Sequence, residues 1–488
     1  MTRRACVARA LSRLPQRLRR GVPKRSAQPA GPPVGPLALI VAFALCAAPA
    51  HARQAPRGDA DPRVERLVSS ISTAHLRELL TTLTSFGTRN TLSNPASTTR
   101  GIGAARQWIF DELRRSSPKL QVRFDSYRLK PQGRIVRDVE VRQVIAVLPG
   151  RSPRRIYVTA HYDTLNLPGQ TAKIVRPSPL PAGFDAQAQP GQDFEVDAPG
   201  ANDDGSGTVL VMELARRFAE SGIEFDATLV FALWSGEEQG EYGSLAHARR
   251  MAAAKTPIDA LFNNDIVGNS HGGNGVFDNG SVRVYSEGPE DSMSRSLARY
   301  IQRAGAIYLP GHRVRPMSRQ DRFQRGSDHE AFNASGFTAV VFRESTENYA
   351  RQHSAADTLD WVDFDYLAQN VRLNAAAVAS LALAPPAPVV VNDRGAPTIG
   401  RGTSGYDAAL TWKASPGASA YRIYWRDAWQ PDWQHQLTVG NVTAFALANL
   451  SIDNVVIGVA AVGPDGHESL VSAYVATARR FAPLQLAP

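Results

Sequence analysis

Residues 155–163 read RIYVTAHYD, and residues 227–240 read ATLVFALWSGEEQG. Each begins with a short run of mostly β-branched, aromatic and other apolar residues, which predicts a buried strand. Acidic or imidazole side chains follow directly after each run. A helical pattern at residues 208–220 separates the two strands. This order favours an α/β fold with a mostly parallel sheet, whose strands carry polar residues to their carboxyl ends.

The same alternation extends along most of the chain. Helices are expected at residues 64–86, 101–115, 208–220, 242–254, 291–305 and 363–383. Strands are expected at residues 120–129, 139–148, 155–160, 227–234, 260–266 and 338–342. Together they predict a three-layer α/β sandwich over residues 63–384, with a long surface loop at residues 166–200.

The chain changes character near its C-terminus. Residues 385–394 (PPAPVVVNDR) are predicted to be a linker. Short strand-like runs separated by turn residues then predict a small β-sandwich at residues 395–482. Residues 420–425 (AYRIYW) and 459–469 (VAAVGPDGHES) resemble fibronectin type III domains. Exposed aromatic residues there, with Trp429 and Trp433 as candidates, would allow contact with protein or carbohydrate.

Residues 1–52 have the order of a secretory signal peptide. A basic region precedes the apolar run 37–48 (LALIVAFALCAA), and the small-residue site Ala50-His51-Ala52 follows. We expect cleavage after Ala52, a tether at residues 53–62, and a secreted or periplasmic protein without a stable membrane anchor. An uncleaved anchor is the alternative.

The charge of the chain is concentrated in this leader. Residues 1–52 hold nine of the 55 Lys and Arg residues and none of the 45 Asp and Glu residues, which leaves 46 basic against 45 acidic residues. The balance argues against a nucleic-acid partner. Both cysteines, Cys6 and Cys46, also lie in the leader. The mature chain therefore has no disulfide, cysteine nucleophile or thiolate metal ligand.

Five segments place acids or histidines where a strand ends or a helix begins. They are residues 158–163 (VTAHYD), 199–207 (PGANDDGSG), 234–240 (WSGEEQG), 262–266 (FNNDI) and 352–358 (QHSAADT). Each one alone is typical of a turn or a helix cap. Together they supply two histidines, three carboxylate ligands and one spare carboxylate. This donor set suits two zinc ions bridged by an aspartate.

The order of these segments resembles the di-zinc aminopeptidase family, which is related to the glutamate carboxypeptidases and glutaminyl cyclases. The resemblance covers roughly residues 64–384. It includes residues 327–332 (SDHEAF), which are similar to the SDHxxF segment of that family.

The resemblance implies a role for each matching residue. His161 and Asp265 would bind one zinc ion. Glu238 and His353 would bind the other. Asp203 would bridge the two ions, and Asp204 would complete the tight turn without binding metal.

The same resemblance implies the catalytic groups. Glu237 would be the general acid/base, and Asp163 would orient His161 through the imidazole N–H. Tyr349 is a candidate for assisting the oxyanion, and Arg325 for contacting the substrate. The expected activity is release of N-terminal residues from peptide substrates.

Three alternatives stay open. The first is glutaminyl cyclisation with one zinc ion. The second is carboxypeptidase action, in which Arg322, Arg325 or Arg343 would bind the substrate carboxylate. The third is a binding protein that keeps the fold without catalysis.

Overall fold

The computed structural model describes residues 60–167, 194 and 196–476. The expected signal peptide and most of the expected tether lie outside the described residues, as do residues 168–193 and 195 of the expected loop. No helix in the described ranges is long and apolar enough to cross a membrane.

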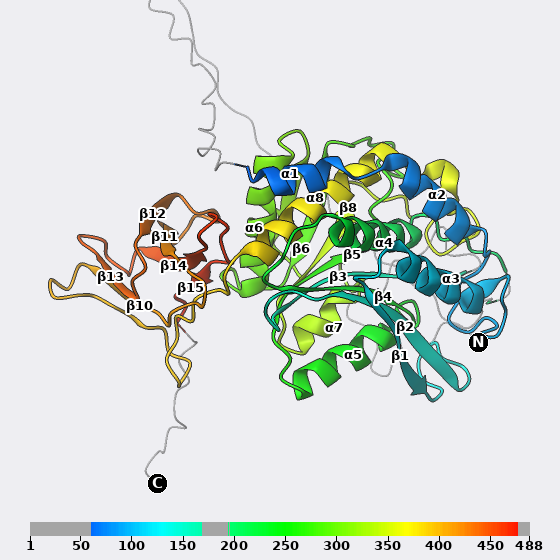
Figure 1. Cartoon of the computed structure of the whole chain (residues 1–488), viewed down its shortest axis with the longest axis horizontal. Helices are drawn as coiled ribbons and strands as arrows, with labels where there is room; N and C mark the ends of the chain where they lie inside the picture. The colour runs from blue at the N-terminus through cyan, green and yellow to red at the C-terminus, as the bar shows by residue number, and fades with distance from the viewer. Residues whose placement is uncertain (1–59, 168–193, 195, 477–488) are drawn as a thin grey trace, which may run out of the picture. The chain divides into compact units, whose positions relative to one another are not determined.

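An eight-stranded mixed sheet forms the centre of the larger region (Figure 1), with the strand order β1-β2-β4-β3-β5-β8-β6-β7. Its strands are β1 (Gln121–Leu129), β2 (Val139–Leu148), β3 (Arg155–His161), β4 (Thr228–Trp234), β5 (Ile258–Asn264), β6 (Ser281–Ser286), β7 (Arg313–Met317) and β8 (Ala339–Glu344). The four central strands β4, β3, β5 and β8 are parallel to one another. The pairs β1–β2, β2–β4 and β6–β8 are antiparallel.

Helices cover both faces of this sheet. They are α1 (Pro62–Ser69), α2 (Thr73–Thr84), α3 (Gly101–Ser116), α4 (Gly205–Glu220), α5 (Tyr242–Ala253), α6 (Met293–Tyr308), α7 (His329–Ala334) and α8 (Phe364–Leu383), and the 3-10 turn η2 is Leu359–Trp361. In Figure 1, α3, α4 and α8 lie on one face, and α5 and α7 lie on the other.

Strand β3 shows how the sequence places its side chains in the two layers. Ile156 and Val158 are buried in the cluster that contains α4 and α8, whereas Tyr157 is buried with Ala248 of α5 and Phe332 of α7. Successive strand residues face opposite sides, so a continuously apolar strand must be covered twice. The predicted three-layer α/β architecture is therefore observed.

Several boundaries differ from the expectations. The single helix expected at residues 64–86 is two helices, α1 and α2. Pro62, expected to end the tether, is the first residue of α1, and Asp61 caps the helix by accepting the Arg63 N–H at 2.7 Å. Strands β6 and β7 were not expected.

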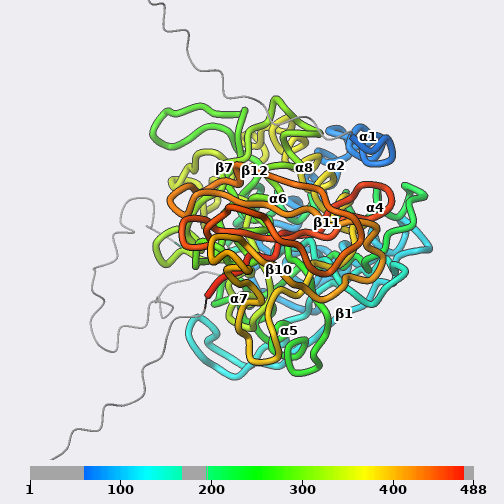
Figure 2. Tube along the Cα trace, turned by 90° about the vertical axis from the view of Figure 1, so that its left-hand side faces the viewer, coloured from blue at the N-terminus to red at the C-terminus, as the bar shows by residue number. Residues whose placement is uncertain are grey.

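The C-terminal strands form two antiparallel sheets (Figure 2, orange to red). They are β9 (Ile399–Gly400), β10 (Ala408–Thr411), β11 (Ala420–Asp427), β12 (His435–Val439), β13 (Ala444–Leu447), β14 (Val455–Val462) and β15 (Ser472–Ala473), in the orders β13-β10-β9 and β12-β11-β14-β15. Val390, expected in the linker, is 5 % exposed and packs in this core. Trp429 is exposed, whereas Trp433 packs against Tyr424. The likeness to fibronectin type III stays a prediction.

Candidate metal centre

The candidate residues meet at the carboxyl edge of the parallel strands. His161 is the last residue of β3, Glu237 and Glu238 follow β4, and Asp265 follows β5. Adjacent parallel strands end side by side, so their terminal side chains share one edge of the sheet. Asp203 joins them from the turn before α4. The His353 backbone has a positive φ of 55° and lies in the segment after β8.

Two groups of candidate ligands share one residue. The first is His161, Asp203 and Asp265, and the second is Asp203, Glu238 and His353. Within each group the ligand atoms lie within 4.8 Å of one another. The two oxygens of Asp203 point to different histidines: Oδ1 is 3.5 Å from Nε2 of His161, and Oδ2 is 3.2 Å from Nε2 of His353. The arrangement has the shape of two adjoining sites joined by a carboxylate.

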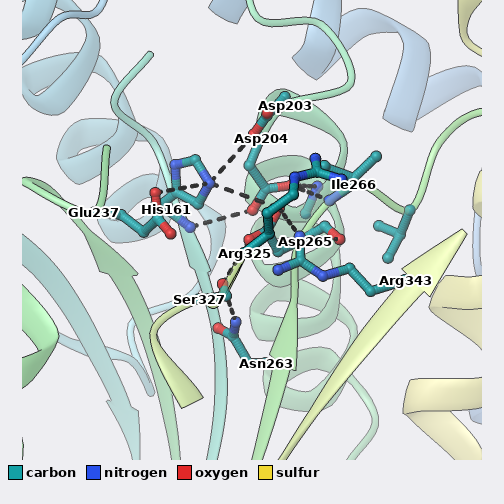
Figure 3. Close-up of polar contacts among 12 residues, drawn as sticks. His161, Asp203, Asp204, Glu237, Asn263, Asp265, Ile266, Arg325, Ser327 and Arg343 are labelled. Atoms are coloured by element: carbon teal, nitrogen blue, oxygen red, sulfur yellow. Dashed lines mark hydrogen bonds and ion pairs between the residues drawn. The ribbon is translucent and has the colours of Figure 1, made fainter. Parts of the chain in front are cut away.

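Figure 3 shows the His161 imidazole at the centre of the first group. Its Nε2 lies 3.8 Å from both Asp265 Oδ1 and Glu237 Oε2. On the other side, His353 Nε2 lies 3.2 Å from Glu238 Oε2. Glu237 therefore pairs with His161 and Glu238 with His353, although His161, Glu237 and Glu238 also form a third group whose ligand atoms lie within 4.8 Å of one another.

Asp204 connects three elements. Its Oδ1 accepts the N–H groups of Gly207 at 2.9 Å and Ile266 at 3.2 Å, and its Oδ2 accepts the His161 N–H at 3.2 Å. The carboxylate thus caps α4 and ties it to the ends of β3 and β5. These contacts agree with the expected turn role.

Asp163 differs in one respect from the expectation. The His161 Nδ1 lies closer to the Asp163 backbone carbonyl, at 3.2 Å, than to its carboxylate, at 3.7 Å. The carboxylate instead accepts the Thr91 hydroxyl at 3.0 Å and the Glu238 N–H at 3.3 Å. The residue therefore orients His161 through its backbone and steadies Glu238 through its side chain.

Asp265 has partners that sequence reasoning missed. Arg343, fully buried, lies 2.6 Å from Asp265 Oδ1, and the Ser327 hydroxyl donates to Oδ2 at 2.5 Å (Figure 3). Arg343 also pairs with Asp321 at 2.9 Å. The SDHEAF segment contributes Ser327, but no local pattern links Arg343 to Asp265.

The two candidates for substrate contact, Tyr349 and Arg325, lie against each other, and neither is a member of the two ligand groups. Tyr349 is 59 % exposed, and the Arg325 guanidinium lies 4.7 Å from its ring centroid. Arg325 also bonds to Gln352 at 2.6 Å and to Glu347 at 3.3 Å. A further acid and histidine group, formed by Asp321, His329 and Glu330, includes a carboxylate already paired with Arg343.

Burial shifts the pKa values of the carboxylates in this centre. It raises the pKa of Glu238 to about 7, and the Asp203 carboxylate adds to the shift. Burial also raises the pKa of Glu237 well above its usual value, with Glu238 and Asp265 adding to it. Crowded, buried carboxylates need a compensating cation or a proton.

These residues fit zinc. The set contains imidazole and carboxylate donors, which are ordinary zinc ligands. Glu238 Oε1 is buried without a hydrogen-bond partner, so it has an open coordination position. His161, Asp203 and Asp265 would hold one ion, and Asp203, Glu238 and His353 a second.

Comparison with known proteins finds a family model, curated relatives and solved structures that are similar to this chain. The model of Peptidase family M28 matches residues 143–378. A protein of Pyricularia oryzae named "Probable zinc metalloprotease" is 34% identical over 90% of this chain and 86% of its own length. Two solved structures are similar at lower identity. The LapA aminopeptidase of Legionella pneumophila is 19% identical, with a TM-score of 0.49 over 66% of this chain and 74% of that chain. The glutaminyl cyclase of Porphyromonas gingivalis is 17% identical, with a TM-score of 0.49 over 63% of this chain and 98% of that chain.

Proposed function

Because this chain belongs to peptidase family M28 and is a zinc metallopeptidase, we propose that it is an aminopeptidase that uses two zinc ions. The carrying observation is the position of Asp203 between two groups of ligands. One of its oxygens faces His161 and the other faces His353. A site for one ion would need only one of these groups, so the sharing of Asp203 favours two ions over the single ion of a cyclase.

Zinc held by these residues would lower the pKa of an attacking water and polarise the scissile carbonyl. Glu237 moves the proton. It lies outside the two groups that share Asp203. It forms a third group with His161 and Glu238, and its Oε2 is 3.8 Å from His161 Nε2. It accepts the proton of the water as the oxygen bonds to the carbonyl carbon. It then returns the proton to the leaving nitrogen as the C–N bond breaks. Burial raises the pKa of Glu237, which makes it a stronger base than an exposed glutamate and so favours the acceptance of the proton.

The charges around the site favour a substrate with a free α-amine. The arginines considered for a substrate carboxylate are already paired: Arg343 with Asp265, and Arg322 and Arg325 with Glu347. A carboxypeptidase would have to break one of these pairs. The carboxylates of the centre, in contrast, attract a cationic amine.

We propose further that the protein is exported, because residues 1–52 have the order of a signal peptide. We propose likewise that the C-terminal strands form a fibronectin type III-like domain and that this region contacts protein or carbohydrate. The seven short antiparallel strands and the exposed Trp429 support them.

The proposal is tested with matched dipeptide substrates, one with a free N-terminus and one with an acetylated N-terminus, together with a zinc count on the purified chain. We expect two ions per chain and hydrolysis only of the free substrate. Hydrolysis of the acetylated substrate alone would indicate a carboxypeptidase. One ion together with pyroglutamate formation from an N-terminal glutamine would indicate a cyclase.

A further inference from the structure

Arg89 is a fully buried arginine, and among the described residues its guanidinium donates hydrogen bonds only to backbone carbonyls. Its Nε donates to the Tyr162 carbonyl at 2.7 Å, just after β3. Its Nη1 donates to the Pro199 carbonyl, and its Nη2 donates to the Gly200 carbonyl at 3.0 Å. One side chain therefore holds both ends of the chain segment that runs from the end of β3 to the turn before α4.

The backbone of Arg89 makes a further hydrogen bond to the same segment. Its N–H donates to Thr164 Oγ1 at 2.9 Å. The approach is so close that a Cβ on Gly200 would lie 2.3 Å from Thr164 Cγ2 and 3.1 Å from Arg89 Nη2. Gly200 also has a φ of +51°, which side chains rarely adopt. The glycine thus permits the contact between the guanidinium and the turn.

A second residue, Asp357, holds the same turn through its backbone N–H groups instead of its carbonyls. The carboxylate of Asp357, which is 3 % exposed, accepts the N–H of Asn202 at 3.0 Å and of Asp203 at 2.8 Å. Asp357 lies four positions after His353. The turn of residues 199–203 is therefore held at its carbonyls by Arg89 and at its amides by Asp357, between the segments that carry His161 and His353.

The positive charge of Arg89 interacts with the carboxylates around the metal centre. Burial lowers the pKa of Arg89 to about 10, and the charges of Asp357, Asp163 and Asp204 oppose this shift. The side chain therefore stays protonated at neutral pH. Burying a cation without a paired carboxylate is costly. Here the carbonyls solvate it, and the acids of the site offset part of its charge.

We propose that Arg89 is a positioning residue for metal binding: by holding the carbonyls of Tyr162, Pro199 and Gly200, it sets Asp203 at the spacing that allows it to face both His161 and His353. The inference rests on the proposed role of Asp203 as a bridge. It gives a function to a residue whose hydrogen bonds within the described part of the chain go to Tyr162, Thr164, Pro199 and Gly200, and to no candidate ligand.

The test compares three variants of the full chain with the wild type: Arg89→Met, Arg89→Lys and the control Arg295→Met. Arg295 is a matched control because it is 7 % exposed and donates to the Met317 carbonyl and the Ser286 hydroxyl. Lys keeps the charge of Arg89 but has one nitrogen in place of the planar three-nitrogen group. Zinc affinity is measured by competition with a chelator, at a temperature where circular dichroism shows each variant folded.

We expect both Arg89 variants to bind the more weakly held zinc ion about 10- to 100-fold less tightly than the wild type, the loss usual for residues that orient metal ligands. Arg295→Met is expected to keep wild-type affinity even if its melting temperature falls. Wild-type affinity in both Arg89 variants would overturn the proposal. Wild-type affinity in Arg89→Lys alone would also overturn it, because charge rather than the hold on three carbonyls would then be the cause.

The readout separates this inference from the proposed function. The number of ions on the wild type tests the two-ion proposal. The ratio of affinities between variant and wild type tests Arg89, and it remains measurable if the wild type binds a single ion. An unchanged ratio with two ions on the wild type would remove the Arg89 inference and leave the proposed function intact.

Discussion

At the scale of single residues, two neighbouring glutamates face different histidines. Glu238 Oε2 lies 3.2 Å from His353 Nε2, and Glu237 Oε2 lies 3.8 Å from His161 Nε2. The sequence could predict that two acids follow a buried strand. It could assign their roles only through the resemblance to a family, because adjacent residues after a strand can point either way.

This difference leads to opposite expectations for two similar substitutions. Glu237→Gln should lower kcat by about 10²- to 10⁴-fold, the usual effect of losing a general base, while the zinc content stays at the wild-type level. Glu238→Gln should lower the zinc content because it removes a ligand. Steady-state kinetics and metal analysis of both purified variants check this. Equal loss of zinc in the two variants would contradict the assigned roles.

The buried carboxylate of Asp125, which lies outside the metal centre, is expected to make the free energy of unfolding depend on pH. Asp125 accepts from Tyr127 at 2.9 Å and lies 2.7 Å from His247 Nδ1. Burial alone would raise the pKa of Asp125, but the hydrogen bonds with His247 and Tyr127 outweigh it and lower the pKa to about 2. A carboxyl whose pKa is lower in the folded state stabilises the fold above its unfolded pKa of about 3.8.

The stabilisation by Asp125 should therefore be present at pH 5 and be lost as the pH falls from about 4 towards 2. The shift corresponds to about 2 kcal/mol of unfolding free energy. We expect Asp125→Asn to flatten this part of the stability curve. Urea unfolding of wild type and variant between pH 5 and pH 2, both in chelator to remove metal effects, measures the difference. Parallel curves would show that Asp125 does not contribute.

At the scale of elements, the central parallel strands were predictable and the outer strands were not. Strands β3, β4 and β5 are buried on both faces and read as apolar runs, which a sequence reveals directly. Strands β6 (SVRVYS) and β7 (RVRPM) carry arginines between their apolar residues. Arg283 of β6 pairs with Glu347 at 2.7 Å, a contact that depends on the folded chain. Such strands are recognisable only once their partners are known.

The start of α4 joins the fold to the site. Gly207 packs so tightly that a Cβ there would lie 2.3 Å from the carbonyl oxygen of Asn264 in β5 and 2.6 Å from the Asp204 carboxylate. The sequence predicted a helix after the turn, but the reason for this glycine lies in the approach of α4 to β5. The same contact fixes the turn that carries Asp203.

Gly207→Ala should therefore destabilise the chain by about 1–3 kcal/mol, the usual effect of overpacking, and weaken zinc binding by moving Asp203. Gly311→Ala is the matched control, because a Cβ at Gly311 would meet nothing within 4 Å. Thermal melts and zinc titrations of both variants provide the measurement. If the two alanine variants behave alike, the tight contact at Gly207 has no energetic consequence.

At the scale of the whole molecule, the near-zero net charge outside residues 1–52 gives no indication that the site concentrates acidic residues. Outside residues 1–52 the chain carries 46 basic and 45 acidic residues, which suggests no local concentration of charge. Folding nevertheless gathers the buried Asp203, Glu238 and Asp265 and the partly buried Glu237 around His161. The motifs predicted this gathering, but they could not predict that Arg89 and Arg343 would be buried beside it. Such long-range compensation depends on the packing of distant segments.

A buried group of carboxylates makes the stability of the whole chain depend on its metal. We expect a chelator to lower the melting temperature and added zinc to restore it. Ligand binding at 100 times Kd adds about 2.7 kcal/mol of stability per site.

Burial raises the pKa of Glu237, so ionisation of this residue at pH 8 opposes folding of the metal-free chain. Glu237→Gln removes that charge. In chelator at pH 8 the variant should therefore melt at a higher temperature than the wild type. This difference should shrink as the pH falls towards 4.5, the ordinary pKa of a glutamate, because the unfolded chain then also binds the proton. If neither added zinc nor Glu237→Gln changes the melting temperature, the centre does not bind zinc tightly enough to offset the charge of its carboxylates.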